Sequence, residues 1–246
     1  MSHIMLCIVY ICIKVYSNLS EFQMGKSMEM QYITVPLKYA PKYLRFNPYI
    51  TDGYRVKLST YECFLSMFRW SNETINIWTH SIGFVVFVGL FLYDFLVFYK
   101  KHKIYDFDVI MALFVLSCFM ICMVFSTMYH LFNCHSFHYC QIWLSWDIFG
   151  ISAAFLAVFI SGIYYGFWCS EHIHLRYTYI GFVFVLFAIA MSFLLMPRLR
   201  GEEYSSARLT LFTLWSLSGI FPTIHWITLY GGVDSEIVQI FFASHI

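Results

Sequence analysis

Long apolar runs separated by short polar segments constrain the fold of this chain more than any other feature. Five runs are long enough to cross the hydrocarbon core of a bilayer, which takes roughly 17–25 apolar residues. They cover residues 77–99, 108–131, 142–168, 177–196 and 207–230. A sixth run, residues 237–246, is too short to cross. We therefore predict an all-α polytopic membrane helix bundle with five complete helices and a partial sixth.

The composition leads to the same class of protein. The 246 residues are 60% hydrophobic and 12% charged, whereas soluble domains are roughly 45–50% apolar and about 25% charged. So little charge cannot cover a water-soluble globule, and the solvent of this chain is membrane lipid. A net charge of +1 argues against nucleic acid, which selects a basic face. The eight cysteines include no C-x-x-C pair, which argues against a disulfide framework or a thiolate metal site.

The first part of the chain differs from the rest. Residues 1–70 contain eight of the fifteen Lys and Arg residues, so we predict a basic N-terminal arm followed by a transmembrane bundle over residues 71–246. With the arm in the cytosol, the inside segments carry eleven basic residues and the outside segments four. This asymmetry favours a cytosolic N-terminus. The apolar stretch 4–13 is too short to span and lacks the basic start of a signal peptide, so its role stays open.

Polar side chains cluster at the end of the second run and the start of the third. Ser126 and His130 are four residues apart and share one helix face, and Asp147 lies just inside the next run. A short connection makes these two helices antiparallel neighbours, so the three side chains can converge in one layer. Three further polar residues at the entry of the first run occupy the same leaflet: Glu73, Asn76 and His80. Ionisable groups at membrane depth indicate a functional site.

This cluster has two interpretations. In the first, the His130 imidazole binds a metal ion, while Asp147 orients a ligand or activates a water molecule. In the second, Ser126, His130 and Asp147 form a hydrogen-bond network that holds two helices together. Spacing by itself favours the network, because one histidine does not make a metal site.

Several linked motifs resemble the progestin and adipoQ receptor family. They are the stretches 47–55 and 71–80, the S-x-x-x-H pattern of Ser126 and His130, the stretch that begins at Asp147, and residues 220–226. The match covers roughly residues 44–240. The resemblance implies a seven-helix fold with a cytosolic N-terminus and a zinc ion near the cytosolic leaflet.

The resemblance also implies roles for individual residues. His130 would be a zinc ligand, Asp147 would position or activate the attacking water, and Ser126 would line the site. The receptor branch resembles ceramidase-like hydrolases, which cleave a lipid amide. The family's other two zinc histidines form an H-x-x-x-H motif on the seventh helix, which this sequence lacks, and His245 has no partner four residues away. We therefore expect a C-terminally truncated product that holds zinc weakly and lacks hydrolase activity.

Three functions remain open. The first is a Golgi or endomembrane signalling regulator whose arm retains a Raf-type kinase, because the stretch 47–55 is most similar to the family branch with that role. The basic residues that would meet an acidic partner are Lys38, Lys42, Arg45, Arg55, Lys57 and Arg69. An equally good interpretation makes them a positive-inside anchor. The second function is a zinc-dependent lipid-amide hydrolase, and the third is a receptor for a steroid or hormone. The sequence leaves the lipid or ligand and the oligomeric state open.

Overall fold

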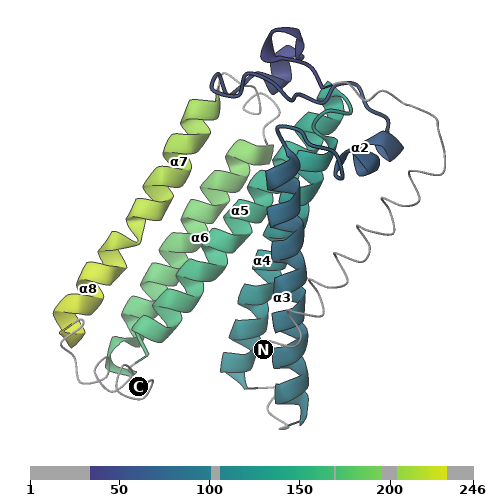
Figure 1. The fold of residues 1–246 in the computed structure, drawn as a ribbon. Coiled ribbons are helices and arrows are strands. Elements are labelled where there is room, and N and C mark those ends of the chain that lie inside the picture. The colour runs from purple at the N-terminus through teal and green to yellow at the C-terminus, as the bar shows by residue number, and fades with distance from the viewer. Residues whose placement is uncertain (1–33, 101–105, 169, 196–203, 232–246) are drawn as a thin grey trace.

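The computed structural model describes residues 34–100, 106–168, 170–195 and 204–231. Within these ranges the chain is helical, and its one β contact is an isolated antiparallel bridge between Val35 and Tyr54. The predicted all-α membrane bundle is thus confirmed (Figure 1). The N-terminal stretch 4–13, the partial sixth run and His245 lie outside the described residues.

Four helices are long and apolar enough to cross a membrane. They are α3 (Thr74–Lys100), α4 (Phe107–Phe132), α5 (Phe137–Gly166) and α6 (Ile173–Leu195). The most apolar window of α3 contains no buried residue, and that of α5 is 33% buried. Apolar side chains that face outward over whole helices are what a lipid environment favours.

The fifth apolar run forms two shorter helices where the sequence predicts one. These are α7 (Ser205–Ser218) and α8 (Ile220–Tyr230), which follow one another almost in line in Figure 1. Pro222 explains the break, because its ring clashes with the carbonyl four residues earlier, which belongs to Ser218 at the end of α7. The α8 helix ends at Gly231, whose φ of 77° is the left-handed conformation that favours glycine.

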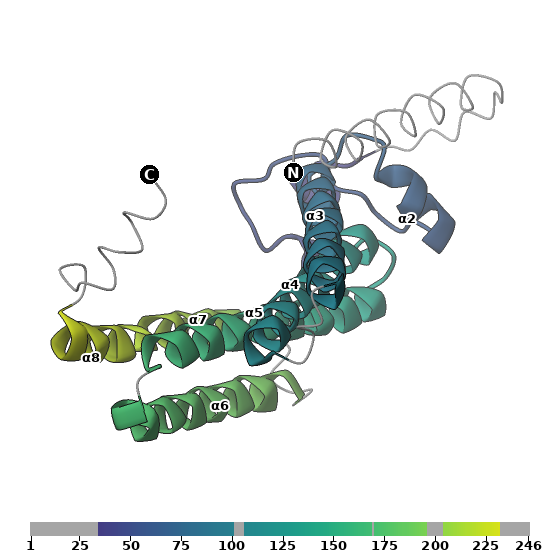
Figure 2. The ribbon, with the colours of Figure 1, turned by 90° about the horizontal axis from the view of Figure 1, so that it is seen from below.

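The long helices pack side by side in chain order. Figure 2 shows α3 beside α4, and α6 and α7 on the α5 side of the bundle. A Cβ atom on Gly150 would lie 2.8 Å from the Cα of Cys122, so glycine is what lets the backbones of α4 and α5 approach closely. Between α5, α6 and α7, the core is built around Trp215, which is 1% exposed.

The described part of the arm, residues 34–70, packs on the end of the bundle where α3 begins and α4 ends (Figure 1). It contains two short 3-10 turns and α2 (Thr60–Ser66), whose first turn is closed by a capping box between Ser59 and Glu62. Tyr54 from the arm packs in one buried cluster with Tyr129 of α4 and Cys140 of α5. The arm thereby brings its own side chains against the polar layer of the bundle.

Candidate functional site

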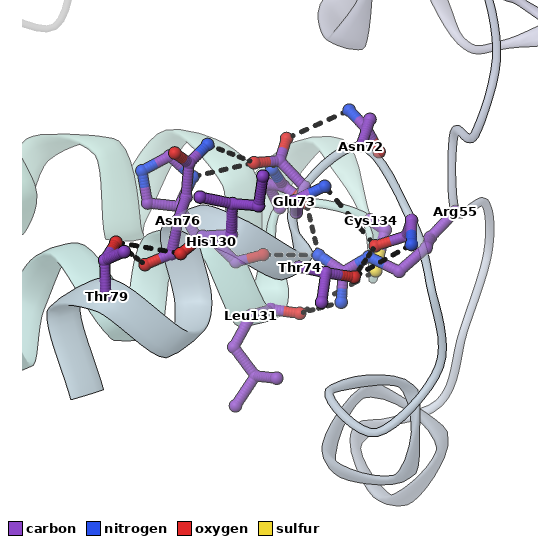
Figure 3. Close-up of polar contacts among 12 residues, drawn as sticks. Arg55, Asn72, Glu73, Thr74, Asn76, Thr79, His130, Leu131 and Cys134 are labelled. Atoms are coloured by element: carbon purple, nitrogen blue, oxygen red, sulfur yellow. Dashed lines mark hydrogen bonds and ion pairs between the residues drawn. The ribbon is translucent and has the colours of Figure 1, made fainter. Parts of the chain in front are cut away.

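Glu73, the residue before α3, is the centre of a buried polar cluster (Figure 3). Its Oε2 atom lies 2.8 Å from Nδ1 of His130 and accepts a hydrogen bond from Nδ2 of Asn76 at 3.2 Å. Its Oε1 atom accepts from Nδ2 of Asn133 at 2.9 Å. Only 5% of the residue is exposed. Burial works against ionisation, but the hydrogen bond and charge of His130 and the Asn76 bond outweigh it, so the Glu73 pKa is lowered from its ordinary value of 4.5.

The Glu73 carboxylate fixes the orientation of the His130 ring. An ionised carboxylate only accepts hydrogen bonds, so Nδ1 of His130 carries the proton and donates it. When the imidazole is neutral, Nε2 is then the ring nitrogen that carries a lone pair. Metal-binding histidines commonly have this arrangement, in which a carboxylate holds one ring nitrogen and the other faces the ligand.

Two more titratable side chains lie beside His130. The ring of His80 meets the His130 ring edge to face, with 5.5 Å between centroids. Asp147 on α5 is 9% exposed, and its carboxyl interacts with the hydroxyl of Ser126 and the charge of His130. Nδ1 of His80 and Oδ1 of Asp147 are buried without a hydrogen-bond partner in the described part of the chain. A buried polar atom without a partner costs roughly 1–3 kcal/mol, which makes these two atoms candidates for contact with a polar ligand.

Arg55 of the arm holds the end of α4 in place. Its guanidinium donates to the backbone oxygen of His130, to the oxygen of Leu131 at 3.4 Å, and to Oδ1 of Asn133 at 3.3 Å. It also donates to Oγ of Ser66 on α2 at 2.7 Å. The last carbonyls of a helix lack partners within the helix and carry partial negative charge, so a cation is favourable there.

Arg55 is not available to a partner, so the prediction that groups it with the partner-binding basic residues is wrong. Arg55 is 1% exposed, because the carbonyl groups at the end of α4 use its donors. The other basic residues of the described arm are on the surface: Lys38, Lys42, Arg45, Lys57 and Arg69. Sequence spacing gives no signal for this difference, since Arg55 meets residues 75 to 78 positions further along the chain.

The structure brings the predicted site residues Ser126, His130 and Asp147 to one layer. The structure also shows that Glu73 contacts His130 directly, whereas the sequence placed these two residues only in the same leaflet. Asn133, which the sequence did not indicate, donates a hydrogen bond to Glu73. His225 lies elsewhere, where its Nδ1 atom is 2.9 Å from the hydroxyl of Tyr179.

The described residues fit part of a zinc site. One imidazole with a carboxylate on its far nitrogen, together with a buried carboxylate oxygen that has no partner among the described residues, is a donor set that zinc accepts. Within the described ranges, however, no group of three or more His, Cys, Asp and Glu residues could hold a metal ion. Since zinc sites use at least three protein ligands, these residues alone do not complete the site.

Comparison with known proteins shows the family of the chain. The family model described as haemolysin-III related matches residues 68–246. The protein named progestin and adipoQ receptor family member 3, from Mus musculus and from Homo sapiens, is 37% identical over 202 residues, which cover 82% of this chain and 64% of the relative. Progestin and adipoQ receptor-like protein 1 of Caenorhabditis elegans is 32% identical over 207 residues, covering 84% of this chain and 47% of the relative.

These matches agree with the motifs in the sequence and with the helical membrane fold. The chain spans 64% of the length of the mouse and human relatives. It belongs to the haemolysin-III-related family, among the progestin and adipoQ receptors.

Proposed function

We propose that Glu73, His130 and Asp147 form part of the zinc centre of a receptor-type membrane protein whose chemistry is the hydrolysis of a lipid amide. The observation that carries the proposal is the 2.8 Å contact between Glu73 Oε2 and His130 Nδ1. In the neutral ring, this contact leaves Nε2 as the nitrogen with the lone pair. His130 also interacts with the Asp147 carboxyl, whose buried Oδ1 atom has no hydrogen-bond partner in the described part of the chain. The proposal requires further zinc ligands from residues beyond the described ranges.

Each side chain has a separate task in this proposal. His130 binds the metal through Nε2, and Glu73 holds the ring in the tautomer that frees this atom. The Asp147 carboxylate positions a water molecule and accepts its proton, while the Ser126 hydroxyl keeps the carboxylate in place. Zinc, when bound, supplies carbonyl polarisation and the activation of water.

Competition with a chromogenic chelator tests this assignment on the detergent-purified protein. The His130→Gln variant removes the ligand nitrogen and is expected to lower zinc affinity by at least tenfold. Glu73→Gln removes the orienting charge and is expected to lower it roughly 10–100-fold. His138→Gln is the matched control, because His138 is an exposed histidine near the same end of the bundle. Equal affinity in all four proteins would exclude His130 as a ligand.

A second function is favoured by the surface of the arm. We propose that the protein resides in the Golgi membrane with the arm in the cytosol, and that the arm retains a Raf-type kinase. Lys38, Lys42, Arg45 and Lys57 are exposed on an arm that the buried Arg55 fixes to the bundle. An ordered basic surface suits an acidic partner better than a freely moving tail does, because less conformational entropy is lost on binding.

Charge reversal tests the kinase proposal in cells. The double variant Lys38→Glu, Lys42→Glu is expected to recover much less kinase by co-precipitation than the unmodified protein. Lys100→Glu, at the far end of α3, is the control and should recover the normal amount. If a glycosylation reporter shows that the double variant inverts the topology, the inversion explains the loss of kinase and these residues are a positive-inside anchor instead. Unchanged kinase recovery with unchanged topology would exclude Lys38 and Lys42 as kinase contacts.

A further inference from the structure

Two cysteines from distant parts of the chain meet under the arm. Cys63 lies on α2, and Cys134 lies in the turn between α4 and α5. Their Sγ atoms are 3.7 Å apart, and the residues are 0% and 1% exposed. Of the five described free cysteines, this is the pair whose sulfur atoms are in contact. The contact joins the arm to the bundle across 71 positions of sequence.

The two thiols are not equivalent. The hydrogen bond between the two thiols lowers the pKa of Cys134, and the positive charge of Arg55 lowers it further against the effect of burial. The same hydrogen bond and burial raise the pKa of Cys63. The charge of Arg55 also acts on Cys63, but there the hydrogen bond and burial outweigh it. Since the thiolate is the reactive form of cysteine, Cys134 is the better nucleophile and Cys63 the resolving thiol.

The position of α2 gives an oxidant a route to the pair. This helix has only seven residues, and its outward side chains Tyr61 and Phe64 are 68% and 45% exposed. Short peripheral elements open locally at a small fraction of the free energy of global unfolding. We expect an opening of α2 to expose the Cys63 sulfur and the side of Cys134 that α2 covers, without unfolding the long helices.

We propose that Cys63 and Cys134 form a redox-responsive dithiol that hydrogen peroxide converts into a disulfide between the arm and the end of α4. The Cys134 thiolate attacks one peroxide oxygen, an S–O bond forms, the O–O bond breaks, and the departing hydroxide is protonated to water. The Cys63 thiol then attacks this sulfur and loses its proton, the S–O bond breaks, and a second water leaves. Two thiols thereby reduce one peroxide to two waters. The sulfur atoms must approach from 3.7 Å to about 2.05 Å.

The disulfide would act on the polar cluster through its neighbour in sequence. Cys134 follows Asn133, whose amide donates to Glu73 and accepts from Arg55. A covalent bond from α2 to this turn would keep the arm closed over Glu73 and His130, whereas the reduced pair lets the arm open. This inference is independent of zinc and of the kinase.

Peptide mass spectrometry on the full chain in detergent micelles tests the proposal. The protein is treated with a peroxide series, then denatured in an alkylating reagent and digested without reductant. We expect a crosslinked peptide that joins Cys63 to Cys134, two hydrogens lighter than the separate peptides and cleaved by dithiothreitol. Cys118 and Cys122, which lie on α4, are expected to remain alkylated and serve as internal controls.

A variant separates the two chemical steps. Cys63→Ser is expected to leave Cys134 as a sulfenic acid that dimedone labels, while the control Cys118→Ser still forms the crosslink. The proposal is overturned if Cys63 and Cys134 of the unmodified protein both remain alkylated at a peroxide dose that fully oxidises a reference cysteine peptide. It is equally overturned if Cys134 crosslinks mainly to another cysteine. Both results come from the unmodified chain, so neither depends on how the variant folds.

Discussion

At the residue scale, the site depends on a buried charge that is stabilised by its neighbours. Glu73 has a lowered pKa because the contacts of His130 and Asn76 outweigh the effect of burial. A carboxyl group whose pKa is lower in the folded state stabilises the fold above its unfolded pKa, which is near 4.5. This contribution is lost as the pH falls through the lower, folded-state value.

The first prediction follows from the lowered pKa of Glu73. Thermal stability of the unmodified protein in detergent is expected to fall as the pH decreases from about 5, and Glu73→Gln should flatten this part of the curve. Above that range the variant should be less stable, because the charge-assisted bond to His130 is weakened. Glu171→Gln is the control and should leave the curve unchanged. A Glu73→Gln curve with the full acid dependence would assign that dependence to other carboxyl groups.

The second prediction concerns Arg55. Replacing it with Met keeps the length of the side chain but leaves the carbonyls of His130 and Leu131 without their charged donor. We expect a loss of about 3 kcal/mol in the free energy of unfolding, since breaking a buried charged contact costs that order of magnitude. Lys42→Met, on the exposed face of the arm, should change stability by less than about 0.5 kcal/mol. Similar losses in both variants would contradict a capping role for Arg55.

The site residues show what spacing can predict. Ser126 and His130 were predictable because four residues of helix place two side chains on one face, and Asp147 because a short connection makes α4 and α5 neighbours. The contacts of Glu73 with His130 and of Arg55 with the end of α4 join residues 57 and 75 positions apart. Helical spacing along the sequence does not predict such contacts, because they depend on how the arm folds back onto the bundle.

At the element scale, apolar length predicts the long helices but not the break in the fifth run. The break follows from Pro222, because α7 ends at Ser218, the residue whose carbonyl the proline ring would meet in a continuous helix. The run remains apolar on both sides of the break, so hydropathy alone gives one helix. The backbone chemistry of a single residue decides the boundary.

The third prediction tests the contact between α4 and α5. Gly150→Ala would place a Cβ atom 2.8 Å from the Cα of Cys122, so one helix must shift, and we expect a loss of about 1–3 kcal/mol. Gly89→Ala on α3 is the matched control, because no atom lies within 4 Å of its new Cβ. That variant should gain roughly 0.5–1 kcal/mol from helix propensity. Denaturation of both variants in the same detergent gives the comparison, and a neutral Gly150→Ala would contradict the close approach of the two helices.

At the scale of the whole molecule, the packing of the arm on one end of the bundle explains the position of the polar cluster. The arm covers one end of the bundle, α3 enters the membrane directly after Glu73, and α4 ends at the same level with His130 (Figure 1). The carboxylate, the imidazole and the covering guanidinium thus come from three segments that meet only in the folded chain. The sequence predicts the class of fold and the convergence of polar side chains from α4 and α5. It does not predict the contacts that the packed arm makes with them.

The measurement that tests the central claim most directly is the zinc content of the purified protein by elemental analysis, after dialysis against metal-free buffer. We predict more zinc in the unmodified protein than in His130→Gln, and the unmodified amount in the control His138→Gln. If the unmodified protein retains no more zinc than His130→Gln, the cluster of Glu73, His130 and Asp147 is a hydrogen-bond network between helices and not part of a metal centre.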